Sequence, residues 1–411
     1  DSYLKGVNGG MEVEVDAGGR PKREVRSIKA QSGNNVVLTL DSRLQQAAED
    51  SLDSGIDLAH KKKYPATGGA MIAMNPQTGE IYAMASFPDF DPKLWVGGMS
   101  DEAYVELTEG GASDPLLNRA VAGQYPPGST FKTATAIAGL QEGVISPLTD
   151  FTCSGVWDVL SQPFKCWGSH GDVDLNKAIV QSCDIYFYNV GYRFYQSNSQ
   201  GIQKWARMTG LGAETGIDLP GEALGRIPDP DWKQRAGETE VDKMWMPGDS
   251  VNLSIGQGDA LVTPLQLATH YSVIANGGRL IQPHVGLRVE DQVTEKTINN
   301  LEPEGSTLMP ISAQNLKAVQ DGLAGATAPG TTVGDTFVGF PIPVAGKTGT
   351  AQVAGKADYA WYAAYAPANN PQVVVVALIE QGGSGGNVAA PTVRRFLETF
   401  FAPAPPPAQG R

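Results

Sequence analysis

The sequence predicts an α+β fold in which a mixed, mainly antiparallel sheet lies between layers of helices. Two apolar stretches, residues 70–74 and 81–84, flank a segment with Pro76 and Gly79, a pattern typical of a β-hairpin. An unbroken aliphatic run at residues 373–379 indicates a buried strand near the other end of the chain. Helical patterns lie between these strands. We therefore expect a sheet that is completed by segments distant in sequence and covered by helices.

The elements before the hairpin follow from local patterns. Glycines and basic side chains alternate through residue 35, which predicts short strands and turns at a domain edge. Residues 36–40 predict a strand. Asp41 then caps a helix that we expect to end near residue 62, because its apolar residues recur at helical spacing: Leu44, Ala47, Ala48 and Leu52.

The elements after the hairpin are less regular until the C-terminus. Residues 280–308 predict an irregular insertion with short strands. Residues 392–401 predict a helix with Arg394 and Arg395 on its outer side. The last residues, 402–411, are rich in proline and predict a disordered tail.

Composition limits the classes of function. The 411 residues carry 31 Lys and Arg against 44 Asp and Glu, a net charge of −13 that argues against nucleic acid as a partner. Hydrophobic residues at 41% and charged residues at 18% are values of a globular protein. The longest aliphatic run is too short to cross a bilayer, and no apolar signal segment begins at Asp1.

Histidine is scarce, which removes one class of hydrolase. The chain has four histidines, and none follows His284. Residues 382–386 match the G-x-S-x-G motif of α/β-hydrolases, but that fold requires its Asp and His after the serine. This segment is therefore interpreted as a flexible glycine loop.

A serine and a lysine at S-x-x-K spacing form a stronger candidate. Ser129 and Lys132 lie in the segment YPPGSTFK at residues 125–132, which leads into a small, apolar helical run. Lys132 would then follow Ser129 by one turn on the same helix face, where an amine can take the hydroxyl proton without a histidine. The alternative interpretation is a serine N-cap with a solvated lysine, because S-x-x-K often occurs by chance.

Two further triplets favour the catalytic interpretation. Ser182 and Asp184 form S-x-D after a helix that we expect to start near Asp174, and an aromatic helix follows them. Lys347 opens the sequence K-T-G-T at the start of a strand-like segment. The chain order S-x-x-K, S-x-D, K-T-G is hard to obtain by accident.

With these motifs the chain resembles the penicillin-binding proteins and the serine β-lactamases, which share S-x-x-K, S-x-N and K-T-G. Further segments are similar to transpeptidase landmarks: GEIYAMAS at 79–86, NRA at 118–120, PGS at 127–129, IGQG at 255–258, TPLQ at 263–266 and DYAW at 358–361. The resemblance implies a penicillin-binding transpeptidase fold over residues 36–401. Residues 1–35 resemble the remnant of the N-terminal pedestal domain of class B enzymes. The S-x-D variant is similar to the elongation, or rod-shape, branch.

The resemblance implies a serine-type peptidoglycan D,D-transpeptidase. Ser129 would attack the carbonyl between two D-alanines of a stem peptide, release D-alanine and pass the acyl group to an amine of a neighbouring stem. β-Lactam antibiotics would acylate the same serine. Lys132 is the expected base, and Ser182 is expected to relay a proton to the leaving amine. Lys347, as a second cation, would help Lys132 to lose its proton.

Backbone groups and the K-T-G-T strand complete the implied site. The N–H groups of Ser129 and Thr350 are expected to form the oxyanion hole. The strand is expected to accept the donor peptide by strand addition, with Lys347, Thr348 and Thr350 at its terminal carboxylate and Gly349 leaving the backbone accessible.

Asp184 departs from the usual asparagine of the second triplet. An ionised carboxylate would favour a protonated Lys132 and oppose its use as a base. We therefore expect either that Asp184 points away toward a structural donor or that the site tolerates it. Tyr359 also replaces a histidine that is common before Ala-Trp, and no role is assigned to it.

Two other functions remain as alternatives. A D,D-carboxypeptidase or β-lactamase-type hydrolase would need a base to activate water, and no glutamate motif like that of class A enzymes is found. A non-catalytic β-lactam sensor would keep the fold without needing the complete set of Ser129, Lys132, Ser182 and Lys347.

The resemblance also implies a cellular location and a partner. Relatives act at the extracytoplasmic, periplasmic face of the bacterial inner membrane, held by an N-terminal helix that this sequence does not include. The implied partner is a SEDS-type glycosyltransferase, contacted largely through N-terminal segments also missing here. No cofactor is expected for catalysis.

The three cysteines cluster in one stretch with a histidine. Cys153, Cys166, His170 and Cys183 are a set of three thiolates and one imidazole, which is a common structural zinc site. Their spacing is not that of a zinc finger, so the zinc prediction depends on clustering. A Cys153–Cys166 disulfide with Cys183 buried, or three free thiols, are the alternatives.

Overall fold

The computed structural model describes residues 3–109, 114–303 and 305–403. The chain divides into two compact units, Asp1–Thr39 with His284–Glu304, and Leu40–Pro283 with Gly305–Arg411. Within the part of the chain that is described, no helix is long and apolar enough to cross a membrane.

The first unit consists of strands alone among its described residues. A hairpin pairs β1 (Gly10–Val15) with β2 (Pro21–Ile28), and every side chain in both strands is exposed. Three further strands form a sheet in the order β12 (Thr297–Asn300), β11 (Gly286–Glu290) and β3 (Asn35–Leu38). The sequence predicted a strand at residues 36–40 and short strands in the insertion at residues 280–308. It did not predict that these two segments would pair with each other. The domain boundary at residue 35 stays a prediction.

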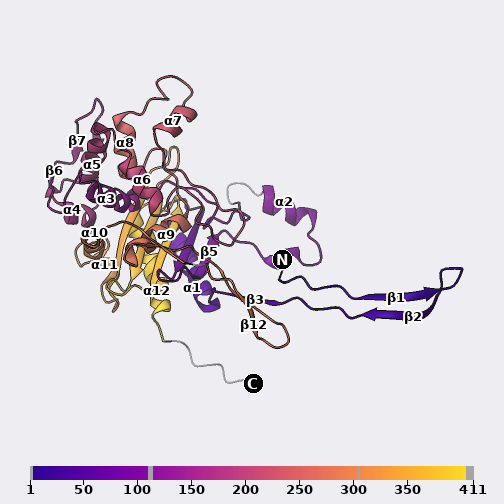
Figure 1. Cartoon of the computed structure of the whole chain (residues 1–411). Coiled ribbons are helices and arrows are strands. Elements are labelled where there is room, and N and C mark those ends of the chain that lie inside the picture. Colours follow the sequence, from indigo (N-terminus) through magenta and orange to yellow (C-terminus); the bar gives the residue numbers. More distant parts are fainter. Residues whose placement is uncertain (1–2, 110–113, 304, 404–411) are drawn as a thin grey trace. The chain divides into compact units, whose positions relative to one another are not determined.

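A five-stranded sheet forms the centre of the second unit (Figure 1). All its pairings are antiparallel, and the strands lie in the order β14 (Ala345–Ala351), β15 (Tyr359–Ala366), β16 (Val373–Glu380), β4 (Gly68–Met74) and β5 (Ile81–Phe87). The predicted hairpin is β4 and β5. The predicted buried strand is β16, which pairs with β4 as expected for a sheet completed by distant segments.

Burial of both sheet faces explains the unbroken aliphatic run in β16. Val373, Val375 and Ala377 belong to the core cluster beneath α1 (Ser42–Lys61) and α12 (Ala390–Phe400). Val374 and Val376 point to the opposite face, where α9 (Pro264–Ala275) packs. A strand between two helical layers has no solvent side, so it needs no polar alternation.

The helix α1 confirms the predicted cap. The Asp41 carboxylate accepts hydrogen bonds from the backbone N–H groups of Arg43 and Leu44, at 2.9 and 3.0 Å. These bonds satisfy two amides that have no partner inside the helix. The predicted C-terminal helix is α12, and its Arg395 is exposed as expected, whereas Arg394 is half-buried.

The remaining elements of the second unit lie mostly on the α9 side of the sheet (Figure 1). The helices are α2 (Asp101–Glu109), α3 (Lys132–Gln141), α4 (Leu175–Val180), α5 (Asp184–Gln196), α6 (Gly201–Met208), α7 (Pro230–Ala236), α8 (Pro247–Ser254), α10 (Ala313–Gly325) and α11 (Gly334–Phe337), with single turns η1 (Pro92–Trp95), η2 (Gly128–Phe131) and η3 (Gly385–Ala389). The short strands are β6 (Phe151–Cys153), β7 (Val156–Trp157), β8 (Phe164–Lys165), β9 (Gly171–Val173), β10 (Arg279–Leu280) and β13 (Thr307–Leu308). Residues 404–411 of the predicted disordered tail lie outside the described residues.

Candidate active site

Ser129 lies in η2, the single turn that leads directly into α3. The sequence predicted a helix N-terminus here, and the structure places Ser129 just ahead of it, with Lys132 as the first residue of α3. Thr130 fixes this turn, because its hydroxyl donates to the Pro127 carbonyl at 2.7 Å. Ser129 is half-buried, so its hydroxyl remains within reach of a ligand.

The turn packs closely against the K-T-G-T strand. A side chain at Gly349 would bring its Cβ to 2.9 Å from the Pro127 carbonyl oxygen, so only glycine fits there. A Cβ at Gly128 would similarly come within 2.9 Å of the Thr350 carbonyl oxygen, and Gly128 also has a positive φ of 54°. The two glycines thus allow the backbone of the serine turn to lie directly against the strand that carries Thr350.

Lys132 is fully buried and forms an ion pair with Asp184. Its Nζ lies 2.6 Å from the Asp184 carboxylate and donates to the Ser182 carbonyl at 2.8 Å and to Ser182 Oγ at 3.2 Å. Of the two alternatives for Asp184, the one in which its carboxylate points away toward a structural donor is therefore excluded. Among the described residues, no hydrogen bond joins Lys132 to the hydroxyl of Ser129. The Lys132 amine is thus surrounded by oxygen acceptors of Ser182 and Asp184.

Lys347 supplies the second amine of the site. It is 1% exposed, and its Nζ donates to the Thr348 carbonyl at 3.3 Å. Burial, and next the charge of Lys132, lower the pKa of Lys347 well below its usual value, while Asp184 acts in the opposite direction. The site thus contains two buried amines and one carboxylate.

Ser182 joins α4 to α5 in a strained conformation. Its φ is +53°, in the left-handed region that a serine rarely adopts. The Ser182 and Cys183 amides are held by carbonyls of α4 at 3.2 and 2.9 Å. This turn directs both the carbonyl and the hydroxyl of Ser182 at Lys132. The predicted flanking helices, starting from an Asp174 cap, are confirmed as α4 and α5.

These residues open into one cleft of about 640 Å³. The predicted residues on its walls are Ser129, Ser182, Asp184, Cys166, Thr348 and Thr350. Gln257 and Asp358 of the IGQG and DYAW landmarks also line it. The sequence assigned no role to the other lining residues, which include Lys165, Trp167, Tyr188 and Asn387. Ser384 and Gly386 of the rejected G-x-S-x-G segment also line the cleft, so that glycine loop belongs to its wall.

A buried ionic network supports the segment that carries Ser129. The Arg119 Nε lies 2.8 Å from the Glu380 carboxylate, to which the Tyr125 hydroxyl donates at 2.7 Å. The ring of Tyr125 packs edge-on against Tyr359 and Trp361 of β15. Glu380 ends β16 and Tyr125 begins the serine segment, so the network ties the nucleophile to the central sheet. Arg119 belongs to the NRA segment at residues 118–120, but nothing in the sequence indicated that it would pair with Glu380.

The predicted cysteine and histidine ligands come together beside the site. The possible ligand atoms of Cys153, Cys166, His170 and Cys183 all lie within 4.8 Å of one another. His170 Nδ1 is 3.3 Å from the Cys153 sulfur and 3.6 Å from the Cys166 sulfur. All three thiols are free. A hydrogen bond from Cys183 lowers the pKa of Cys166 to about 5, and the same contact raises that of Cys183.

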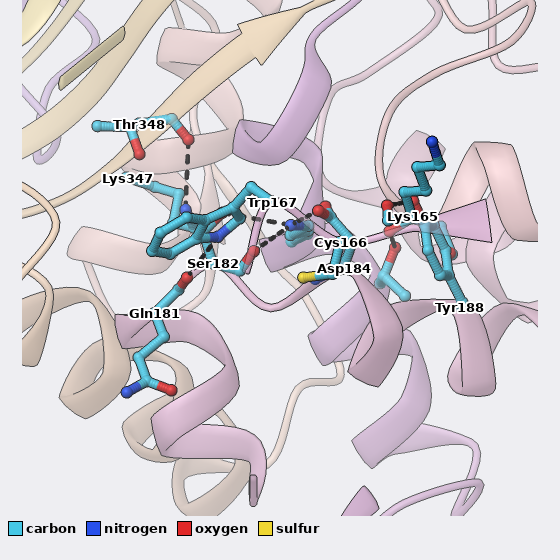
Figure 2. Close-up of polar contacts among 12 residues, drawn as sticks. Lys165, Cys166, Trp167, Gln181, Ser182, Asp184, Tyr188, Lys347 and Thr348 are labelled. Atoms are coloured by element: carbon cyan, nitrogen blue, oxygen red, sulfur yellow. Dashed lines mark hydrogen bonds and ion pairs between the residues drawn. The ribbon is translucent and has the colours of Figure 1, made fainter. Parts of the chain in front are cut away.

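The donor set and its spacing fit a zinc ion. Thiolate sulfur and imidazole nitrogen are its preferred ligands, at about 2.3 and 2.0 Å, so small movements would gather these four atoms around one ion. The Cys166 sulfur also accepts the Asp184 N–H at 3.3 Å. The cluster therefore contacts the same residue that pairs with Lys132, as Figure 2 shows for Cys166 and Asp184.

Comparison with known proteins gives consistent results. The family model described as the penicillin-binding protein transpeptidase domain matches residues 69–398. The peptidoglycan D,D-transpeptidase MrdA of Haemophilus influenzae is 34% identical over 426 residues, which cover 98% of this chain and 61% of that protein. The chain thus spans less than two thirds of that relative's length.

Solved structures agree with this assignment. One is described as the structural coordination of polymerization and crosslinking by a peptidoglycan synthase complex, with a TM-score of 0.84, 35% identity, and coverage of 97% of this chain and 68% of that one. A second is the complex between penicillin-binding protein PBP2 and MreC from Helicobacter pylori, with a TM-score of 0.82, 28% identity, and coverage of 97% and 70%. The chain belongs to the penicillin-binding protein transpeptidase family, in the branch of the MrdA elongation enzymes.

Proposed function

We propose that this protein is a peptidoglycan D,D-transpeptidase that crosslinks stem peptides through an acyl-enzyme on Ser129. The observation that carries this proposal is that Ser129, Ser182 and Thr350, from segments far apart in the sequence, line one cleft, and that the buried Lys132 amine contacts Ser182 Oγ. The name of the Haemophilus influenzae relative supports the same activity. β-Lactam antibiotics are proposed to acylate the same serine.

The acylation step requires a nucleophile, a base and an oxyanion hole. Ser129 Oγ attacks the carbonyl carbon, its proton passes to a neutral Lys132 amine, and the developing oxyanion is held by the N–H groups of Ser129 and Thr350. Ser182 Oγ, which Lys132 contacts at 3.2 Å, returns the proton to the leaving D-alanine amine. An amine from a second stem then attacks the acyl-enzyme and restores Ser129.

Lys132 must lose a proton before it can act as this base, because Asp184 stabilises its ammonium. Lys347 is the second amine of the site, and it would help Lys132 to lose that proton, because the two positive charges disfavour each other, as the lowering of the Lys347 pKa by Lys132 indicates. The terminal carboxylate of the donor peptide, bound by Lys347, Thr348 and Thr350, would then meet a charged Lys347. Gly349 has a packing role in this arrangement, because the serine turn lies against it.

Covalent labelling tests the nucleophile. After treatment with benzylpenicillin, mass spectrometry should find one adduct per chain on the peptide that contains Ser129, and none in Ser129→Ala. An adduct that persists in Ser129→Ala would overturn the assignment. Hydrolysis is the alternative function, and rapid nitrocefin turnover instead of stoichiometric trapping would favour it, whereas no reaction would favour a sensor.

Two lysine variants separate the proposed roles. Lys132→Ala should abolish acylation because it removes the base. Lys347→Arg keeps a charge but misplaces it for the carboxylate, so it should only slow acylation. Equal acylation rates in the two variants would contradict these roles.

We also propose that Cys153, Cys166, His170 and Cys183 bind a structural zinc ion. Zinc there would stabilise the turn that presents Ser182 and Asp184 to Lys132, because Cys183 lies between them in the chain. Elemental analysis of protein purified without a metal-affinity tag should find about one equivalent of zinc per chain. His170→Ala should lose the metal, and His60→Ala, which alters a histidine outside the cluster, should keep it.

Thiol titration under denaturation distinguishes the alternatives for this cluster. The zinc site requires three titratable thiols together with bound metal. Three thiols without metal would favour free cysteines. Fewer than three thiols without metal would favour the Cys153–Cys166 disulfide.

We propose an extracytoplasmic location at the bacterial inner membrane, with anchoring by a segment outside this sequence. A SEDS-type glycosyltransferase is the proposed partner, supported by the likeness to the chain from a peptidoglycan synthase complex. The likeness to PBP2 in complex with MreC makes an MreC-type protein a second candidate partner. Co-purification of the full-length protein with each candidate would test these assignments.

A further inference from the structure

Lys165 places a positive charge on the wall of the cleft. Its backbone is fixed, because β8 pairs with β7 and the Lys165 carbonyl accepts the Tyr188 hydroxyl at 2.9 Å. Its side chain is exposed and forms no ion pair with any described residue. In Figure 2 the Lys165 amine extends away from Tyr188. Because the backbone of Lys165 is held in place while its amine stays accessible, this side chain is suited to binding a ligand.

Trp167 stands two residues further along the same wall. Its indole N–H donates to the Gln181 carbonyl at 3.0 Å, and its ring packs edge-on against His170 with centroids 4.8 Å apart. The side chain is nevertheless 66% exposed. A large aromatic ring that is held in place but left open to a cleft offers apolar contact area at little entropic cost.

The other charges of the cleft leave Lys165 as its accessible cation. Lys132 and Lys347 are buried, and Lys165 is the only lysine or arginine among the described residues that line the cleft. Of the lining carboxylates, Asp184 is paired with Lys132, and burial raises the pKa of Asp358. The protein has a net charge of −13, which repels anionic ligands in general. The Lys165 ammonium favours binding of an anionic group of a ligand at this place in the cleft.

We infer that Lys165 and Trp167 form a subsite for a second carboxylate on the acyl donor, in addition to the terminal carboxylate bound by the K-T-G-T strand. Lys165 would pair with this carboxylate, and Trp167 would pack against the neighbouring apolar part of the ligand. Cys166, between them, positions both residues, because its amide donates to the Gly155 carbonyl at 3.0 Å and its sulfur accepts the Asp184 N–H. This inference rests on the proposed function and narrows its substrate to donors with an upstream acidic group.

A matched pair of penicillins isolates the second carboxylate. Carbenicillin differs from benzylpenicillin by one carboxylate on the side-chain carbon, so the ratio of their second-order acylation rate constants reports that group alone. Lys165→Gln should lower the carbenicillin-to-benzylpenicillin ratio about threefold to fivefold, the range for a partly exposed ion pair. Lys165→Glu should lower it further, and Lys165→Arg should restore it. Trp167→Leu should slow acylation by both drugs.

Controls separate this subsite from general charge effects and from the proposed function. Lys62→Gln removes an exposed lysine of the second unit that does not line the cleft, and it should leave the ratio unchanged. An unchanged ratio in Lys165→Gln would overturn the subsite while leaving the proposed function intact. Failure of benzylpenicillin to acylate the unmodified protein at Ser129 would instead overturn the proposed function.

Synthetic donors identify the source of the carboxylate in the natural ligand. Pentapeptides ending in D-Ala-D-Ala can carry a free carboxylate at the second residue, at the third residue, at both or at neither. D-Alanine release should depend on Lys165 only for the peptides that carry the recognised carboxylate, and that dependence should weaken as salt is raised. Equal sensitivity of all four peptides to Lys165→Gln would contradict the subsite.

Discussion

Asp184→Asn tests how the site controls the proton on Lys132. The substitution keeps an oxygen that accepts a hydrogen bond at the same position but removes the negative charge that stabilises the ammonium. Acylation requires the neutral amine, so the acid limb of its pH–rate profile reports the loss of that proton. Without the carboxylate, the proton leaves at lower pH, so the acid limb of the profile moves toward acid. The pKa of Lys347 changes in the same direction, because Asp184 raises it.

The geometry sets the size of this shift. An opposite charge within about 4–6 Å favours the charged form by about one to three pH units, or about 1.4–4 kcal/mol. Lys132 is fully buried and the Nζ–Oδ1 distance is 2.6 Å, while Asp184 is 16% exposed to solvent. We therefore expect the acid limb to move toward acid in Asp184→Asn, in the direction in which the pKa of Lys347 changes when the Asp184 charge is removed. The plateau should fall, because a less basic amine is a weaker general base.

The assay is the second-order rate constant of benzylpenicillin acylation, measured by mass spectrometry from pH 4 to pH 9. Asp358→Asn is the matched control, since Asp358 lines the same cleft but pairs with no lysine among the described residues. Its profile should keep the acid limb of the unmodified protein. An acid limb that stays in place in Asp184→Asn, or that moves to higher pH, would refute the proposed proton balance.

Three further substitutions test the framework around the site. Glu380→Gln removes the carboxylate that pairs with the buried Arg119 guanidinium and should lower the free energy of unfolding in urea by about 3–5 kcal/mol. This loss should exceed that of Tyr125→Phe, which removes one hydrogen bond, and equal losses would contradict the ionic network. Burial lowers the pKa of His270 to about 3, so the free energy of unfolding should fall by about 1.4 kcal/mol per pH unit as the pH drops from about 6.5 toward 3. His270→Gln should remove that part of the pH dependence of urea unfolding, and the same pH dependence in this variant would contradict the assignment. Gly349→Ala should slow acylation about tenfold to a hundredfold by displacing the serine turn, and an unaltered rate constant would show that the turn tolerates a methyl group.

Elements with strong local signals could be predicted from the sequence. The α1 cap, the β4–β5 hairpin and the aliphatic β16 each depend on residues that are neighbours in the chain. The same holds for the serine turn and the K-T-G-T strand, because their motifs are short and ordered. The approach of Cys166 to His170 and Cys183 was also predictable, since every cysteine lies in one stretch of the chain.

Features that depend on distant partners could not be predicted. An acid at the end of an aliphatic strand, as at Glu380, does not reveal that Arg119 and Tyr125 will meet it. Asp184 posed the same difficulty: both of its expected orientations satisfied local rules, and only the packing of α3 against α5 places it at Lys132. Lys165 and Trp167 carried no motif, and their exposure within a cleft is a property of the assembled fold.

The pairing of β16 with β4 has a consequence for how this protein is made. All the helices from α2 to α11 lie between β4 and β16 in the chain, so the apolar edge of β4 that β16 covers has no partner until those helices have been synthesised. Contacts of such high contact order form slowly, and an unpaired apolar strand edge invites aggregation. Late closure of the sheet would thus delay formation of the cleft, because Thr348 and Thr350 of β14 form part of its wall.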